Sequence, residues 1–244
     1  MHALAVLLAA ATLVPQKTTA TVVGRLVQRA QPIYCAGSSG RAFALTLDDG
    51  PGPYTPQLAA VLRRERARAT FFVVGSRVAL FPESMQAAAR VGVFGNHTWS
   101  HPHLRGLSHR DARRELEQAE VAITRASGTR PRLFRPPFAE AGPADERLAR
   151  RFDLLDVRWS VDGGDALPGA TPRGVVRAAT RGLAPGAIVL LHDAHPWTAR
   201  VVARVLAAAR ARGLTPVTVP DLLELQPPSA AQLAGTGSAR CPHG

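Results

Sequence analysis

The stretch AFALTLDDGPGPYTP, residues 42–56, joins a strand-like run to two adjacent acids and a turn. The run is short and apolar, with aromatic and β-branched members, which is typical of a buried strand. It ends at Asp48 and Asp49, and Gly50–Pro51 follow directly. Two neighbouring carboxylates at the end of a buried strand repel each other and are costly to desolvate. An acidic turn with an Asx-type cap is the simplest interpretation, and a charged partner is the alternative.

The rest of the chain alternates strand-like and helix-like segments. Strands are expected at residues 43–47, 69–74, 93–95, 133–135, 154–160, 188–191 and 215–219. Helices are expected at about 55–66, 82–91, 108–127, 143–151, 172–183 and 198–212, with Ser108 and Thr171–Pro172 as helix starts. Repeated strand–helix units predict an α/β fold with a parallel sheet, and about seven of them predict a barrel or near-barrel.

Polar residues follow the expected strands at the points where these strands end. In parallel α/β folds, catalytic groups lie at the carboxyl ends of the strands. We therefore expect one face of the molecule to gather Asp48–Asp49, His97, Arg135, Asp162–Asp165 and His192.

The composition indicates one globular domain. The chain has 244 residues, of which 46% are hydrophobic and 20% charged, so it can bury one sizeable core and is not a disordered protein. The formal net charge of +12 comes almost entirely from arginine, and Lys17 is the only lysine. The arginines are spread along the helices and are not clustered with aromatic residues. This pattern predicts a solvated surface, with at most a weak attraction to anionic polymers, and no nucleic-acid partner.

The ends of the chain differ from its middle. The apolar run HALAVLLAAATLVP, residues 2–15, has the length of a signal peptide, although no lysine or arginine precedes it. It is too short for a comfortable membrane span. We expect residues 1–20 to be a signal peptide or apolar segment, 21–40 a lead-in linker, 41–226 the main domain and 227–244 a loose tail. Export to the cell envelope or the medium is the corresponding expectation.

The two cysteines, Cys35 and Cys241, lie near opposite ends of the chain. A bridge between them would join the terminal segments and would suit an oxidising compartment. Two unpaired structural thiols are the alternative. The spacing fits no metal-binding motif.

A second motif, GNHTWSHPHL at residues 95–104, places His97 and His101 four positions apart. On one helical turn such a pair lies on the same face and can chelate a divalent metal. Most isolated pairs of this kind are surface or core histidines, so the interpretation depends on a further donor. Two histidines and one aspartate leave positions open for water and substrate, which is typical of a catalytic metal site. One aspartate of the first motif would then complete the site, and its neighbour would act as a base.

Five short motifs follow one another along the chain: TLDDGP (46–51), HTWSH (97–101), RPPF (135–138), DGGD (162–165) and VLLH (189–192). In this order they resemble the motifs of the NodB-type polysaccharide deacetylases, carbohydrate esterase family 4, over roughly residues 42–225. The resemblance implies a distorted (β/α)7 barrel, a divalent metal such as Zn²⁺ or Co²⁺, and the removal of acetyl groups from sugars.

The resemblance also implies roles for the first three motifs. Asp49, His97 and His101 would hold the metal, and Asp48 would be the general base that takes a proton from the attacking water. Arg135 would pair with Asp48, orienting it and tuning its pKa. The charge of the metal would make the two adjacent carboxylates tolerable.

The remaining motifs would supply groups around the acetyl carbonyl. The backbone N–H of Phe138 would help to hold the oxyanion, and His192 would be the general acid, its pKa raised by Asp165. Three departures from the family pattern fall here, and the first, Phe138 in place of the commoner tyrosine, keeps the backbone donor. Ala139 stands where glycine is frequent, which makes that loop less free. Ala166 replaces the tryptophan that usually follows the aspartate, which puts the pocket shape and substrate preference in doubt.

These inferences favour an exported, monomeric, metal-dependent deacetylase of polymers that contain N-acetylglucosamine, such as peptidoglycan or chitin. O-Deacetylation of acetylated xylan is the alternative reaction. A weakened relative that only binds polysaccharide is a second alternative, which the intact Asp48 and His192 disfavour. Two histidines and a carboxylate can also bind iron in an oxygenase, but Asp48, Arg135 and His192 have an obvious use in hydrolysis and none in oxidation.

Overall fold

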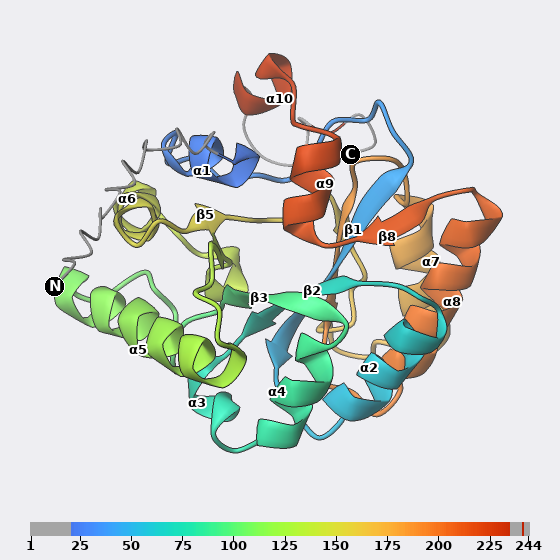
Figure 1. Ribbon diagram of the computed structural model, residues 1–244, viewed down its shortest axis with the longest axis horizontal. Coiled ribbons are helices and arrows are strands. Elements are labelled where there is room, and N and C mark those ends of the chain that lie inside the picture. Colours follow the sequence, from blue (N-terminus) through green and yellow to red (C-terminus); the bar gives the residue numbers. More distant parts are fainter. Residues whose placement is uncertain (1–20, 235–240, 242–244) are drawn as a thin grey trace, which may run out of the picture.

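The computed structural model describes residues 21–234 and residue 241 (Figure 1). The expected signal segment, residues 1–20, lies outside the described residues, and so do residues 235–240 and 242–244 of the expected tail. Within the described part, no helix combines the length and the apolar character that a membrane span requires.

Strand β1 (Ala42–Gly50) is the centre of the sheet, and nearly all of its residues are buried. Along one side it runs parallel to β7 (Ile188–His192). Along the other side it pairs first with β8 (Thr215–Val217) and then, from Thr46 onward, with β2 (Ala69–Val73). The fold is therefore built around the strand that carries the two acids.

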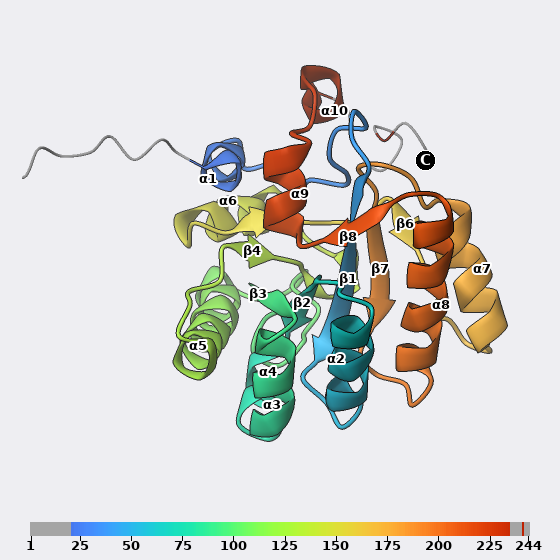
Figure 2. The same ribbon diagram turned by 45° about the vertical axis from the view of Figure 1, so that its right-hand side comes forward.

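The segment expected as one strand over 154–160 connects the two edges of the curled sheet. From β2 the sheet continues through β3 (Gly92–Asn96), β4 (Leu133–Phe134) and β5 (Leu155–Asp156), whereas β6 (Val161–Asp162) pairs with β7. The prediction of a single strand was wrong, because the segment pairs with one edge of the sheet at its start and with the other edge at its end. The chain consequently forms the predicted distorted (β/α)7 barrel (Figure 2).

Helices surround the sheet (Figures 1 and 2). Each predicted helix is present, as α2 (Thr55–Arg64), α4 (Pro82–Ala89), α5 (His109–Ser127), α6 (Pro143–Arg151), α7 (Pro172–Arg181) and α8 (Thr198–Ala211). The structure adds the short helices α3 (Gly75–Val78) and α9 (Val219–Leu225).

Local chemistry explains where two of these helices begin. The side chains of Ser108 and Thr171 accept hydrogen bonds from the backbone N–H groups of Asp111 and Gly174, so they cap α5 and α7 as predicted. Helix α5 then buries one apolar stripe at helical spacing, formed by Ala112, Leu116, Ala119 and Ile123. This stripe holds α5 beside β3 and the site described below.

Residues 21–40 are not the loose lead-in that the sequence predicts. They contain helix α1 (Val22–Val27), which buries most of its side chains in a cluster shared with α9. The N–H of Val22 donates to the carboxylate of Glu224 on α9 at 2.7 Å, and Ile33 bridges to the segment between β5 and β6. A helix of 6 residues is too short to show a period in the sequence, and its apolar face is covered only by elements far along the chain.

Cys35 and Cys241 form a disulfide bond, which decides between the two interpretations of the cysteines. The described part of the expected tail also contains helix α10 (Ala230–Ala234). The side-chain amide of Gln232 donates to the carbonyl of Ala36 at 2.8 Å. The tail is thus attached to the lead-in both by a covalent bond and by a hydrogen bond.

Candidate active site

Asp48 and Asp49 face the same histidine because β1 ends in a bulge. In a regular strand, neighbouring side chains point to opposite faces of the sheet. Here the register of β1 against β2 shifts between Asp48 and Gly50, and Asp49 has a φ of +70°. The Nε2 atom of His97 lies 3.8 Å from Oδ2 of Asp48 and 3.4 Å from Oδ1 of Asp49. Both carboxylates are therefore directed toward one imidazole.

His97 and His101 lie on a loop, and the expectation of a helical turn was wrong. The loop follows β3, and its His101 has a φ of +60°. Glu115 of α5 holds it by accepting hydrogen bonds from the N–H groups of Trp99 at 2.9 Å and Ser100 at 2.8 Å. The two imidazole rings remain neighbours, with centroids 4.9 Å apart. A tertiary contact thus replaces the helix that the spacing suggested.

Asp49, His97 and His101 form a three-residue cluster that can hold a metal ion. Each offers one ligand atom, and these atoms lie within 4.8 Å of one another. Nδ1 of His97 lies 2.6 Å from the carbonyl oxygen of Arg135. Because a carbonyl only accepts, Nδ1 carries a proton, and Nε2 is the ring nitrogen of His97 that faces the cluster and can bind a metal. The hydrogen bond outside the cluster therefore prepares His97 as a ligand.

The ionisation of Asp49, and its oxygen that is unpartnered in the described part of the chain, also suit the binding of a cation. Its Oδ1 lies 3.4 Å from Nε2 of His97 and 3.2 Å from Nε2 of His101. This atom is buried and has no hydrogen-bond partner among the described residues. Burial alone would raise the pKa of Asp49, but the two imidazoles hold it well below its usual range. An ionised carboxylate with two imidazoles is a donor set that suits Zn²⁺ and leaves coordination positions open.

Arg135 is completely buried and fixes Asp48. Its Nη1 donates to Oδ1 of Asp48 at 2.7 Å and to Oγ1 of Thr46 at 2.8 Å. Its Nε and Nη2 donate to the carbonyl oxygens of Val157 and Arg158 at 2.8 and 3.0 Å. The ion pair expected from the sequence is thus one part of a network in which every guanidinium nitrogen donates.

His192 and Asp165 form the second charged pair at the strand ends. Nδ1 of His192 lies 2.8 Å from Oδ1 of Asp165, whose Oδ2 accepts the backbone N–H of His192 at 2.7 Å. Burial would lower the pKa of His192, but Asp165 and the negative charge of Asp48 outweigh it and raise the pKa to about 9. The imidazolium therefore persists at neutral pH. Asp162, by contrast, is exposed and accepts the N–H of Gly164 at 2.7 Å, which makes it a turn residue.

Phe138 lies in a left-handed turn beside the cluster of Asp49, His97 and His101. Phe138 and Ala139 have φ values of +56° and +57°, a conformation that costs about 1–2 kcal/mol for a residue with a side chain. The ring of Phe138 meets His101 edge to face, with centroids 4.7 Å apart, and stacks on His103 at 4.0 Å. Nδ1 of His103 lies 3.0 Å from a carboxylate oxygen of Glu140. Ala139 thus adopts the backbone conformation for which glycine would be the less strained choice.

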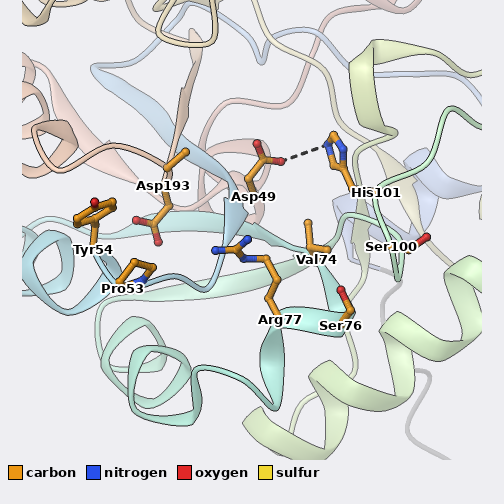
Figure 3. A pocket seen from close by; sticks show the side chains of 10 residues that line it. Asp49, Pro53, Tyr54, Val74, Ser76, Arg77, Ser100, His101 and Asp193 are labelled. Carbon is orange, nitrogen blue, oxygen red and sulfur yellow. Dashed lines mark ion pairs between the residues drawn. The ribbon is translucent and has the colours of Figure 1, made fainter.

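A cavity of about 470 Å³ opens beside the cluster and is lined by Asp49 and His101 together with residues that the sequence analysis did not select (Figure 3). Among these are Tyr54, which lies shortly after the first motif, Arg77 from α3 and Asp193, which directly follows His192. The ligand cluster therefore lies at the wall of a cavity large enough for a sugar residue.

Asp193 is a buried acid whose contacts only the fold reveals. One of its oxygens makes a very short hydrogen bond with the hydroxyl of Thr55, and its backbone N–H donates to the carbonyl of Asp48 at 2.8 Å. Burial raises the pKa of Asp193 to about 7, although Thr55 and Arg77 act in the opposite direction. Its position next to the fifth motif is the signal that could have drawn attention to it.

Comparison with known proteins shows the family of the chain. Residues 36–154 match the family model described as polysaccharide deacetylase. The chain is 37% identical over 163 residues to a chitooligosaccharide deacetylase of Bradyrhizobium sp. (strain ANU 289), covering 65% of this chain and 74% of that protein. It belongs to the polysaccharide deacetylase family.

Two further relatives extend the likeness. The peptidoglycan-N-acetylmuramic acid deacetylase PdaC of Bacillus subtilis (strain 168) is 32% identical over 188 residues, covering 76% of this chain. The solved structure of the Bc1960 peptidoglycan N-acetylglucosamine deacetylase superposes with a TM-score of 0.75 at 27% identity, covering 81% of this chain and 95% of that one. The chain spans only 39% of the length of PdaC.

Proposed function

We propose that this protein is a metal-dependent deacetylase that hydrolyses the acetamido groups of N-acetylated sugars in a polysaccharide such as peptidoglycan or chitin. The observation that carries the proposal is the convergence of Asp48 and Asp49 on His97 within a family of polysaccharide deacetylases. The substrates named for the relatives support an N-acetylated glycan and a location outside the cytoplasm, in the envelope or the medium.

Asp48 is the proposed general base. Arg135 engages its Oδ1, which leaves Oδ2 directed toward His97 and the metal-ligand cluster. A water that attacks the acetyl carbonyl beside this cluster can give its proton to Oδ2. The charge of Arg135 and its fixed geometry keep the carboxylate in one position, so that the base is oriented before the substrate arrives.

The acetyl carbonyl becomes an oxyanion when water adds to it. A divalent cation held by Asp49, His97 and His101 would supply Lewis-acid activation of the water and the carbonyl. The backbone N–H of Phe138 is the proposed protein donor to the oxyanion, because Phe138 borders His101.

His192 is the proposed general acid. Its pKa of about 9 keeps it protonated at neutral pH, and Asp165 fixes the ring through Nδ1, so that Nε2 can donate a proton. The C–N bond breaks as the sugar nitrogen takes this proton, and the products are acetate and the free amine. Ala166, where the family has tryptophan, is exposed and leaves the pair of Asp165 and His192 intact, which disfavours a relative that only binds sugar.

Acetate release tests the proposal. The purified protein is incubated with chitooligosaccharide, peptidoglycan and acetylated xylan, each with chelator and with added zinc. Zinc-dependent acetate release from an N-acetylated polymer supports the proposal. Release from acetylated xylan alone would identify an O-deacetylase, and no release from any of the three would contradict the enzymatic function.

A further inference from the structure

Arg158 lies outside the five motifs, yet its side chain is almost completely buried next to the Phe138 turn. Asp156 holds the guanidinium by two contacts, Nε to Oδ1 at 2.7 Å and Nη2 to Oδ2 at 2.9 Å. The remaining nitrogen, Nη1, donates to the carbonyl oxygen of Ala139 at 2.5 Å. All three nitrogens are therefore committed, and the third reaches the turn.

The turn needs such support because of its residue types. Phe138 and Ala139 are consecutive non-glycine residues with positive φ, and neither gains from that conformation by itself. Pro136 and Pro137 stiffen the chain before the turn. Arg158 holds the carbonyl at its far side. A glycine at position 139 would make the left-handed conformation less costly, so the arginine compensates for a departure in this chain's own sequence.

The same residue also reaches the general base through its backbone. The carbonyl of Arg158 accepts the hydrogen bond from Nη2 of Arg135 at 3.0 Å, and Arg135 in turn holds Asp48. Arg158 thus connects the turn with the ion pair of the base.

The ion pair of Arg132 with Asp153 is a useful comparison for the pair of Arg158 with Asp156. Arg132 pairs with Asp153 through Nη2 to Oδ2 at 3.0 Å and donates from Nε to the carbonyl of Asp153 at 3.2 Å. Its side chain is 44% exposed, whereas that of Arg158 is 7% exposed. Burying an ion pair carries a desolvation penalty, so it is weak evidence for stability alone. The contact that distinguishes Arg158 is the one to the turn.

We infer that Arg158, held by Asp156, is a positioning residue that fixes the left-handed turn and so presents the N–H of Phe138 to the oxyanion. The inference rests on the proposed deacetylase function and adds a residue that the motifs do not contain. Arg158 touches no reacting atom and acts through Ala139.

Arg158→Lys tests this role, with Arg132→Lys as the matched control. Lysine keeps the charge beside Asp156 but cannot make three fixed contacts. We expect kcat to fall by about 10-fold or more, with KM changed by less than about twofold, because the loss concerns a group used in the transition state. Arg132→Lys should change neither constant. Equal kcat values for Arg158→Lys and the unaltered protein would overturn the inference.

Ala139→Gly provides a rescue experiment. Glycine adopts positive φ readily, so Arg158→Lys/Ala139→Gly should recover part of the lost kcat, by about threefold or more over Arg158→Lys alone. A recovery shows that the defect lies in the turn. If the double variant is no better than Arg158→Lys, the turn is not what Arg158 supports.

A measurement without substrate or metal separates positioning from general stability. The chain has 8 phenylalanines, so ¹⁵N-phenylalanine labelling gives few amide signals, and Phe138→Leu identifies that of Phe138. In Arg158→Lys the Phe138 signal should shift and exchange faster, while the signals of core residues such as Phe43 and Phe71 stay in place. An unchanged Phe138 signal, or a shift of all signals with a lower Tm, would overturn the inference. Absence of acetate release from the unaltered protein would instead contradict the proposed function and leave this measurement valid.

Discussion

The two ends of the barrel are stabilised in different ways. At the carboxyl end of β1 lie buried charges and strained backbone: five of the eight described non-glycine residues with positive φ belong to the site, namely Asp49, Thr98, His101, Phe138 and Ala139. At the amino end lie α1 and α9 (Figure 2), whose valines and leucines share one hydrophobic cluster. The disulfide bond joins the segments that flank this end. Strain is tolerated at a functional site only when the rest of the structure supports it. Substitutions at the carboxyl end should therefore mainly change activity, and substitutions at the amino end should mainly change stability.

The largest effect at the site end is expected from His101→Ala. It removes one of three ligand donors, so zinc binding measured by calorimetry and acetate release should both be lost. The Tm of the metal-free protein should change little, because His101 is partly exposed. Zinc binding with unaltered affinity would remove His101 from the ligand set.

Asp48→Asn should abolish the function of the general base without abolishing metal binding. The amide keeps an oxygen for Arg135 but cannot take a proton, so kcat should fall by about 10²–10⁴-fold while zinc still binds. Acetate release and calorimetry on the same preparation check both parts. Activity near that of the unaltered protein would exclude Asp48 as the base.

At the amino end, removal of the disulfide bond should lower stability and leave activity unchanged. Replacing both Cys35 and Cys241 by serine removes a bond that closes most of the chain, and unfolding free energy should fall by about 2–5 kcal/mol. Denaturant titration measures this loss, and kcat measured well below the new Tm should be unchanged, because the bond lies at the other end of the barrel. A large loss of kcat at full folding would show that the two ends are coupled.

The smallest expected effect is a shift in pH dependence for Asp165→Asn. The raised pKa of His192 means that its acid function, and its contribution to stability, are complete below about pH 6.5 and are lost as the pH rises through about 9. Without the negative charge of Asp165, the basic limb of the kcat profile should move to lower pH by about one unit. If the basic limb does not move, it reports the titration of a group other than His192.

Much of the candidate site was predictable because its residues lie in short sequence motifs. All of the selected residues lie at or just after the carboxyl ends of strands, and parallel strands bring these ends together: Asp48, Asp49, His97, Arg135, Asp165 and His192. The contacts of Arg158 and Asp193 were not predictable, because their partners are distant in the chain: Ala139 in one case and Thr55 in the other. The spacing of the two histidines indicated a helix, and Glu115 of α5 instead holds them on a loop.

The sequence by itself determined the parallel α/β barrel, the buried strand before Asp48 and the residue types at its carboxyl end, because these depend on apolar periodicity and on neighbouring residues. Only the tertiary structure decided that the two acids face one imidazole, that the lead-in is helical and that the cysteines are bonded. Each of these depends on a partner that is distant in the chain or on a bulge set by strand pairing, and neither leaves a local pattern.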